Sequence, residues 1–197
     1  MAQEHTFASP GPAGLAALAV ACFGFAAVFL GKVGLVGLPL LAAWLVGGGI
    51  VQWTTAVMEL KDHNIVGGNV FLFFAAFFMF AAALSVFAKF MLLSFNIKPL
   101  SYVEGWLWMA GAGFLTVVTP AYFKANKAIC ILVLLVDVVL WTIVTLDLGI
   151  SDPAVWKPVV GYLLIVAGWI GIYLAGAVVC NTAYGKAIYP VPSPFIK

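Results

Sequence analysis

Two polar side chains lie inside long apolar runs of the sequence, and either could act on a solute. Asp137 is the one acidic residue within the run 128–146, and Gln52 stands late in the uncharged run 33–58. At the centre of a bilayer an ionised Asp costs roughly 2.5–3.5 kcal/mol on insertion scales, so it has to be protonated, paired or solvated. A buried amide likewise has to be hydrogen-bonded or face water.

The sequence leaves two interpretations of Asp137 open. The residues about one helical turn away are apolar: Val133, Leu134, Leu140 and Trp141. Its partner therefore has to lie on another helix, and the candidates are Thr116, Gln52 and Tyr173. Asp137 is then either a protonatable site that couples solute movement to protons, or a neutral residue that fixes helix packing. Gln52 has the same two alternatives, a helix–helix hydrogen bond or a position facing a pore.

The composition places these residues in a membrane protein. Of 197 residues, 65% are hydrophobic and 8% charged, with a mean hydropathy of +1.16, whereas a soluble domain carries about 25% charged residues. The cations are nine lysines without arginine, which gives neither an Arg fork for phosphate nor a basic patch for nucleic acid. The lipid bilayer is therefore the expected partner, and nucleic acid is excluded.

No enzyme chemistry is predicted. Cys22, Cys130 and Cys180 lie in apolar runs without metal-ligand spacing, and we find neither a nucleophile–base set nor a nucleotide loop. The charges Glu59, Lys61, Asp62 and His63 follow an apolar run and are expected to be solvated at the membrane interface. We expect no cofactor and no metal.

The uncharged runs predict an all-α membrane protein with short loops, because a helix needs about 20 residues to cross a bilayer. The first 31 residues contain no Lys, so the first run is expected to be retained rather than removed as a signal peptide. One domain, 1–197, is expected to hold six transmembrane helices at 14–31, 35–58, 65–90, 104–123, 128–147 and 158–184.

The distribution of lysines predicts the orientation. Six spans place Lys61, Lys124, Lys127, Lys186 and Lys197 on the side of the termini, against Lys32, Lys89, Lys98 and Lys157 on the other side. Five against four favours cytoplasmic termini in a plasma (inner) membrane.

Two segments have a composition that suits close backbone approach. Ser9 and Pro10 suit an N-cap and a first helical position, although Pro12 and two glycines indicate an irregular start. Such a start is an ordinary helix terminus or, at membrane depth, a binding place for an anion. Ala167, Gly171 and Ala175 form a stripe of small residues that predicts helix packing.

The segment Ser9–Leu15, Ser-Pro-Gly-Pro-Ala-Gly-Leu, resembles the Asn-Pro-Ala-Pro-Leu-Gly-Leu signature of the succinate–acetate permease (AceTr) family. The similarity covers nearly the whole chain in order. It continues in Gly48–Gln52, in Glu59, Asn64, Gly67, Phe71 and Phe77, and in Tyr173–Ala175, Asn181, Gly185, Lys186, Pro190 and Val191.

This resemblance implies transport of small carboxylates, acetate and succinate, by an anion channel or a proton-coupled permease (symport). It also implies a homohexamer with a conduit through each protomer and a narrow waist, which falls here on Leu18, Phe74 and Val136. The residues expected along the pathway are Ser9, Pro10, Gly14, Leu18, Gln52, Asn64, Phe71, Phe74, Val136 and Asp137.

The chain departs from the family pattern at the waist. Leu18 and Phe74 stand where the family has an aromatic residue and a tyrosine, so the waist is wholly apolar. An apolar waist without Arg also fits a channel for a small neutral solute, such as ammonia, urea or the protonated acid. A membrane sensor that has lost transport is a third possibility.

Overall fold

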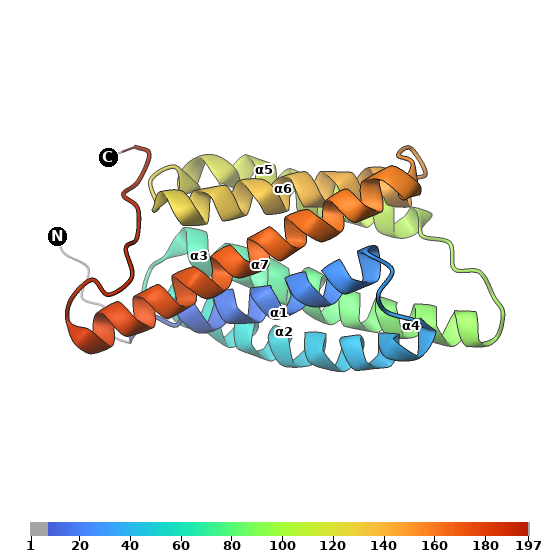
Figure 1. The fold of residues 1–197 in the computed structure, drawn as a ribbon, viewed down its shortest axis with the longest axis horizontal. Coiled ribbons are helices and arrows are strands. Elements are labelled where there is room, and N and C mark those ends of the chain that lie inside the picture. Colours follow the sequence, from blue (N-terminus) through green and yellow to red (C-terminus); the bar gives the residue numbers. More distant parts are fainter. Residues whose placement is uncertain (1–7, 197) are drawn as a thin grey trace.

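The computed structural model describes residues 8–196, and within them the chain is helical without a β-strand. The helices form six rods, of which consecutive ones run in opposite directions (Figure 1). α3, η2 and α4 together make one continuous rod. The elements are α1 (Gly11–Phe29), the single 3₁₀ turn η1 (Leu35–Gly37), α2 (Leu38–Lys61), α3 (Ile65–Phe73), the π-helix η2 (Phe74–Ala81), α4 (Ala82–Ser94), α5 (Tyr102–Tyr122), α6 (Lys127–Asp147) and α7 (Pro153–Tyr184).

Length and apolarity identify the rods that can cross a membrane. Within residues 8–196, five helical segments are long and apolar enough to cross a membrane: Gly11–Phe29, Leu35–Lys61, Ile65–Ser94, Lys127–Asp147 and Pro153–Tyr184. α5 is long enough at 21 residues but is less apolar, because it includes Glu104, Thr116 and Pro120. Helices satisfy their backbone hydrogen bonds internally, as lipid requires. The predicted all-α membrane fold is confirmed.

Local side-chain chemistry sets several helix ends. Asn64, Asn126 and Asp152 each accept a hydrogen bond of 2.9–3.0 Å from a backbone N–H in the first turn of α3, α6 and α7. α7 ends at Gly185, whose φ of 62° is easily reached only without a Cβ atom. α7 begins at Pro153, five residues before the predicted span.

The start of α1 differs from the sequence prediction. Pro10, not Ser9, is the N-cap, and no side chain caps the helix. The Pro10 carbonyl accepts N–H bonds from Ala13 and Gly14, at 3.1 and 3.4 Å. Pro12 near the helix start lacks an N–H and so leaves no donor unsatisfied there.

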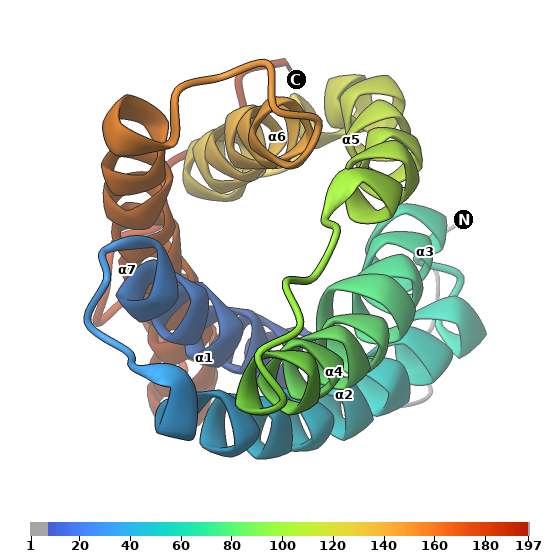
Figure 2. The same cartoon turned by 90° about the vertical axis from the view of Figure 1, so that its right-hand side faces the viewer.

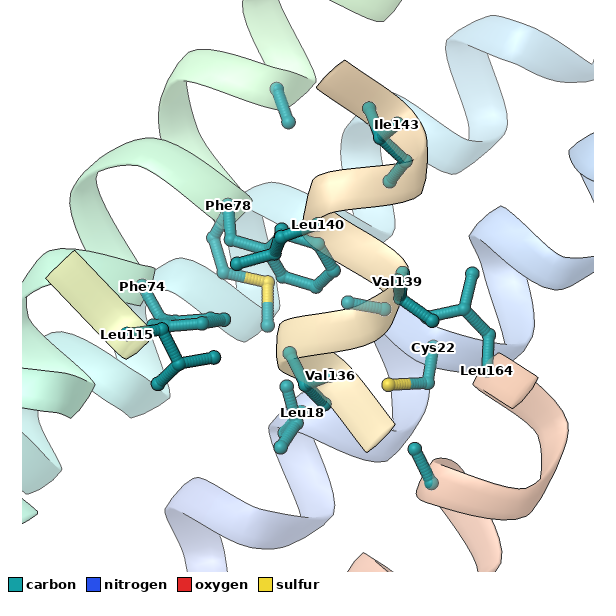
Figure 3. Packing of buried hydrophobic residues seen from close by; sticks show 14 of the residues in the cluster. Leu18, Cys22, Phe74, Phe78, Leu115, Val136, Val139, Leu140, Ile143 and Leu164 are labelled. Carbon is teal, nitrogen blue, oxygen red and sulfur yellow. The ribbon is translucent and has the colours of Figure 1, made fainter. Parts of the chain in front are cut away.

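The rods enclose an apolar interior. α1 packs on α2 and α7, and α6 packs on α5 and α7, so the helices form a ring in the end-on view (Figure 2). The small residues of α7 lie against α1: a Cβ atom on Gly171 would be 3.2 Å from the Leu15 carbonyl. Inside the ring, buried side chains from five rods meet around α6 (Figure 3).

Candidate functional site

A hollow opens at the end of the bundle where α1 begins and α2 ends. Its volume is about 450 Å³, and we call it the vestibule. It brings together three residues predicted for the pathway (Ser9, Pro10 and Asn64) with titratable groups from the turn between α2 and α3. Its lining residues are Ser9, Pro10, Glu59, Asp62, His63, Asn64 and Ile65.

Glu59 is held in the wall of the vestibule by Asn64. The Asn64 amide donates to Glu59 Oε2, while its Oδ1 atom accepts from the Gly67 N–H. Glu59 is buried, so the expectation of a solvated interfacial charge is wrong for this residue. The five-residue spacing from Glu59 to Asn64 could have indicated this contact in the sequence, because the turn between α2 and α3 brings the two side chains together.

Gly14 lies between the vestibule and the interior. A Cβ atom there would be 2.7 Å from the Phe71 ring and 2.9 Å from Thr55 Cγ2. Both distances are below those that real Cβ atoms adopt, so α1 approaches α2 and α3 this closely because residue 14 has no side chain. The Thr55 hydroxyl also donates to the Pro10 carbonyl at 3.4 Å.

Beyond Gly14 lies a second, smaller space, which we call the inner cavity. The predicted waist residues Leu18, Phe74 and Val136 converge on it from α1, η2 and α6 (Figure 3). Its volume is about 40 Å³, and its lining residues are Leu18, Gln52, Val70, Phe71, Phe74, Leu115, Leu132, Val133 and Val136. Gln52 and Phe71, which were also predicted for the pathway, line the same cavity. Sequence reasoning missed Val70, Leu115, Leu132 and Val133, which carry no polar signal.

Gln52 is the one polar residue that lines the inner cavity, as far as the described part of the chain shows. Its side chain is 0% exposed, and its Nε2 atom donates to the Gly14 carbonyl at 3.4 Å. Its Oε1 atom has no hydrogen-bond partner within residues 8–196. The lining of the cavity is therefore apolar except for Gln52, whose side chain has an acceptor oxygen without a partner among the described residues and a second amide N–H beside the one bonded to Gly14.

Asp137 lies outside this cavity. The Thr116 hydroxyl is 2.8 Å from Asp137 Oδ1 and accepts the Trp141 indole N–H at 2.9 Å. Thr116 and Trp141 are exposed, so this polar group lies on the outer side of α5 and α6. The other two candidate partners bond elsewhere, since the Tyr173 hydroxyl donates to the Pro190 carbonyl at 2.7 Å. One helical position turns a side chain by about 100°, which separates Asp137 from its neighbour Val136.

Comparison with known protein families identifies the family to which this sequence belongs. Residues 1–193 match the GPR1/FUN34/yaaH family. The chain belongs to this family. The GPR1/FUN34/yaaH family is the acetate transporter family, so the predicted membership is confirmed.

A solved structure is similar to this member of the GPR1/FUN34/yaaH family over most of its length. It is described as the structure of the bacterial acetate channel SatP. The TM-score is 0.80 at 20% sequence identity, and the alignment covers 94% of this chain and 99% of the other. At this identity the likeness shows a shared fold. A comparison with curated proteins gave no match.

Proposed function

We propose that this chain carries small carboxylates such as acetate across a membrane, and that they pass the inner cavity in the protonated, uncharged form. Membership of the GPR1/FUN34/yaaH family and the shared fold with an acetate channel support transport of small carboxylates. One observation carries the proposal about the protonated form: Gln52 lines the apolar cavity, and its Oε1 atom is an acceptor without a partner within residues 8–196.

An acceptor distinguishes the two forms of a carboxylic acid. A carboxylate ion has only acceptor oxygens, so it cannot form a hydrogen bond with the acceptor Gln52 Oε1. The ion would also lose its hydration among apolar side chains, which costs far more than burial of a neutral group. The undissociated acid donates its O–H to Gln52 Oε1. A proton therefore accompanies each carboxylate, as in a symport.

The vestibule suits this chemistry. Glu59, Asp62 and His63 can each exchange protons with a solute, and they line the hollow together. Glu59 lies beside the start of α1, where a Cβ atom on Gly11 would be 3.2 Å from its Oε1. An arriving acid thus meets proton-exchanging groups before it reaches the apolar waist. Succinate is larger and has two carboxyl groups, so we expect it to cross more slowly than acetate.

The same acceptor favours a second candidate function. Ammonia and urea are neutral and have N–H donors for Gln52 Oε1. A channel for a small neutral solute is therefore the alternative to carboxylate transport.

We further propose that several copies assemble in the plasma membrane, as the hexamer implied by the resemblance, with cytoplasmic termini. Asp137, Thr116 and Trp141 support assembly, because polar side chains on the outer face of a membrane helix are costly against lipid. The lysine count of the sequence supports the orientation, with five on the side of the termini (Lys61, Lys124, Lys127, Lys186 and Lys197) against four on the other side.

Uptake of radiolabelled acetate into proteoliposomes tests the function. A pH gradient that is acidic outside should drive uptake without an electrical current, and competing small acids should reduce it. Protein-free liposomes measure the acid that crosses lipid alone. Electrogenic uptake that ignores the pH gradient would contradict passage of the acid. Faster passage of ammonia or urea than of acetate would favour the alternative, and no flux of any solute would indicate a sensor.

A further inference from the structure

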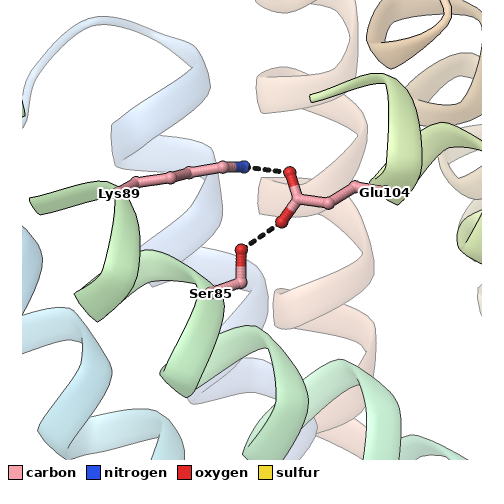
Figure 4. Close-up of polar contacts among 3 residues, drawn as sticks. All are labelled: Ser85, Lys89 and Glu104. Atoms are coloured by element: carbon pink, nitrogen blue, oxygen red, sulfur yellow. Dashed lines mark hydrogen bonds and ion pairs between the residues drawn. The ribbon is translucent and has the colours of Figure 1, made fainter. Parts of the chain in front are cut away.

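A charged cluster lies at the end of the bundle opposite the vestibule. Lys89 of α4 forms an ion pair with Glu104 Oε2 of α5, and the Ser85 hydroxyl donates to Glu104 Oε1 (Figure 4). The side chains of Lys89 and Glu104 are 33% and 19% exposed. α4 and α5 make few other contacts, and the linker 95–101 joins them across the end of the ring (Figure 2). The cluster therefore bridges two helices that are otherwise separate here.

The α4 side of this cluster continues the face that lines the inner cavity. Phe74, Phe78, Ala82, Ser85 and Lys89 follow one another at intervals of four, four, three and four residues. Within α4 these intervals place Ala82, Ser85 and Lys89 on one face, which η2 joins to Phe74 and Phe78. Phe74 lines the cavity, and Phe78 and Ala82 are buried in the apolar core. Lys89 thus stands at the outer end of a stripe that begins at the waist.

The α5 side has the same arrangement. Glu104, Trp108 and Leu115 lie on one face, and Leu115 lines the cavity. The rings of Trp108 and Phe78 meet edge to face with their centroids 6.0 Å apart. Phe78 and Trp108 therefore lie between the waist and the Lys89–Glu104 ion pair, within the apolar core.

The contacts of Glu104 show which ligand this site accepts. An ammonium group and a hydroxyl bind the two oxygens of a carboxylate, which is supplied by the chain itself. A small carboxylate solute has the same head group. Asp147 is close enough to interact electrostatically with both Lys89 and Glu104, and Lys157 lies near Asp147. Release of Glu104 therefore leaves Lys89 with a neighbouring countercharge.

We propose that Lys89 and Ser85 form a carboxylate-binding site at this mouth, and that Glu104 is an internal competitor which an arriving carboxylate displaces. The proposal rests on the proposed function, since it names the site where the solute enters or leaves. It is compatible with passage of the acid through the waist, because carboxylates exchange protons with water at the mouth.

Two single variants separate this site from a simple structural clamp. Glu104→Gln removes the competing carboxylate from Lys89 and Ser85, whereas Lys89→Gln removes the binding cation. A carboxylate site requires opposite effects of these two changes on acetate affinity. A clamp requires the same effect, since either change breaks the ion pair. Lys98→Gln, at an exposed position of the linker 95–101, is the matched control for loss of charge.

The measurements are binding of isotope-labelled acetate to the purified protein by NMR, and the acetate concentration at half-maximal uptake. We expect Glu104→Gln to lower the dissociation constant for acetate and the half-maximal uptake concentration by about threefold or more. We expect Lys89→Gln to raise both quantities by a similar factor, since one ion pair competes with one solute contact. Lys98→Gln should change neither. Shifts in the same direction, or no shift in either variant, would overturn the site.

These readouts separate the site from the transport function. Opposite shifts in binding, with no uptake by the wild type, would support the site and remove the transport function. Proton-driven uptake by the wild type, without opposite shifts in the variants, would remove the site and keep the function. Absence of both binding and uptake in the wild type would overturn both.

Discussion

Gln52 and Asp137 are both polar residues inside apolar helices, but their surroundings differ. Gln52 lines the inner cavity and keeps one acceptor oxygen unpaired, while Asp137 is bonded to Thr116 on the outer side of α5 and α6. A buried polar group without a partner needs an explanation, and at Gln52 the one that we propose is a solute in the adjacent cavity. The more unusual residue in the sequence, Asp137, is the one that lies away from the inner cavity.

The largest effect is expected at Gly14, which lies beside Gln52. Gly14→Leu would place a side chain where even a Cβ atom is 2.7 Å from the Phe71 ring. Acetate uptake into proteoliposomes should fall to the level of protein-free liposomes. Gly113→Leu is the matched control, because a Cβ atom on Gly113 has no neighbour within 4 Å. Uptake at the wild-type rate in Gly14→Leu would remove this segment from the pathway.

Gln52→Leu is expected to have the next largest effect. It removes the acceptor and keeps a side chain of similar size. Because a hydrogen bond contributes about 1–1.5 kcal/mol, acetate uptake should fall roughly tenfold. Asp137→Leu should leave uptake within about twofold of wild type, since surface changes away from a site have small effects. If the two variants reduced uptake equally, the distinction between the two residues would be lost.

Phe74→Ala should act on selectivity rather than close the pathway. Removing this ring widens the waist, so uptake of larger carboxylates should rise several-fold relative to acetate. Competition between acetate and longer acids measures the change. Phe77→Ala is the control, because Phe77 is 53% exposed and does not line the cavity. Identical selectivity in the two variants would place the waist elsewhere.

The smallest effect is expected at Asp137. Asp137→Asn keeps the contact with Thr116, so the pH profile of uptake should superimpose on that of the wild type. Asp137→Leu should lower the free energy of unfolding by about 0.6 kcal/mol, the mean for a hydrogen bond between membrane helices. A thermal unfolding series measures this loss. A flattened pH profile in Asp137→Asn would restore the proton-site interpretation.

The sequence named some residues of the inner cavity and missed others. Leu18, Phe74 and Val136, which the resemblance assigns to the waist, all line the cavity, and their role as a waist for a solute stays a prediction. Leu115 was not predicted, because a membrane helix is apolar on all sides and hydrophobic periodicity does not reveal its rotation. Glu59 was misinterpreted for the opposite reason: a charge at the end of an apolar run indicates an interface, although the fold buries it.

Helix ends were also predicted less accurately than helix positions. The last span was predicted from its run of uncharged residues and therefore started after Lys157. In the structure α7 begins at Pro153, and Asp152 caps it. α1 similarly begins at Gly11 rather than at residue 14. A charge near a helix terminus is tolerated at the membrane surface, so it marks the edge of the apolar layer and not the end of the helix.

The π-helix η2 connects the inner cavity to the Lys89–Glu104 cluster within a single rod. A π-helical turn contains more residues than an α-helical one, so η2 sets the rotation of α4 relative to α3. Loss of one residue from Phe74–Ala81 would turn α4 by about 100°. Lys89 would then point away from Glu104, while Gly14 and Phe71 would keep their contact. A single insertion or deletion in η2 can therefore change which α4 side chain faces Glu104, without altering the contacts around Gly14.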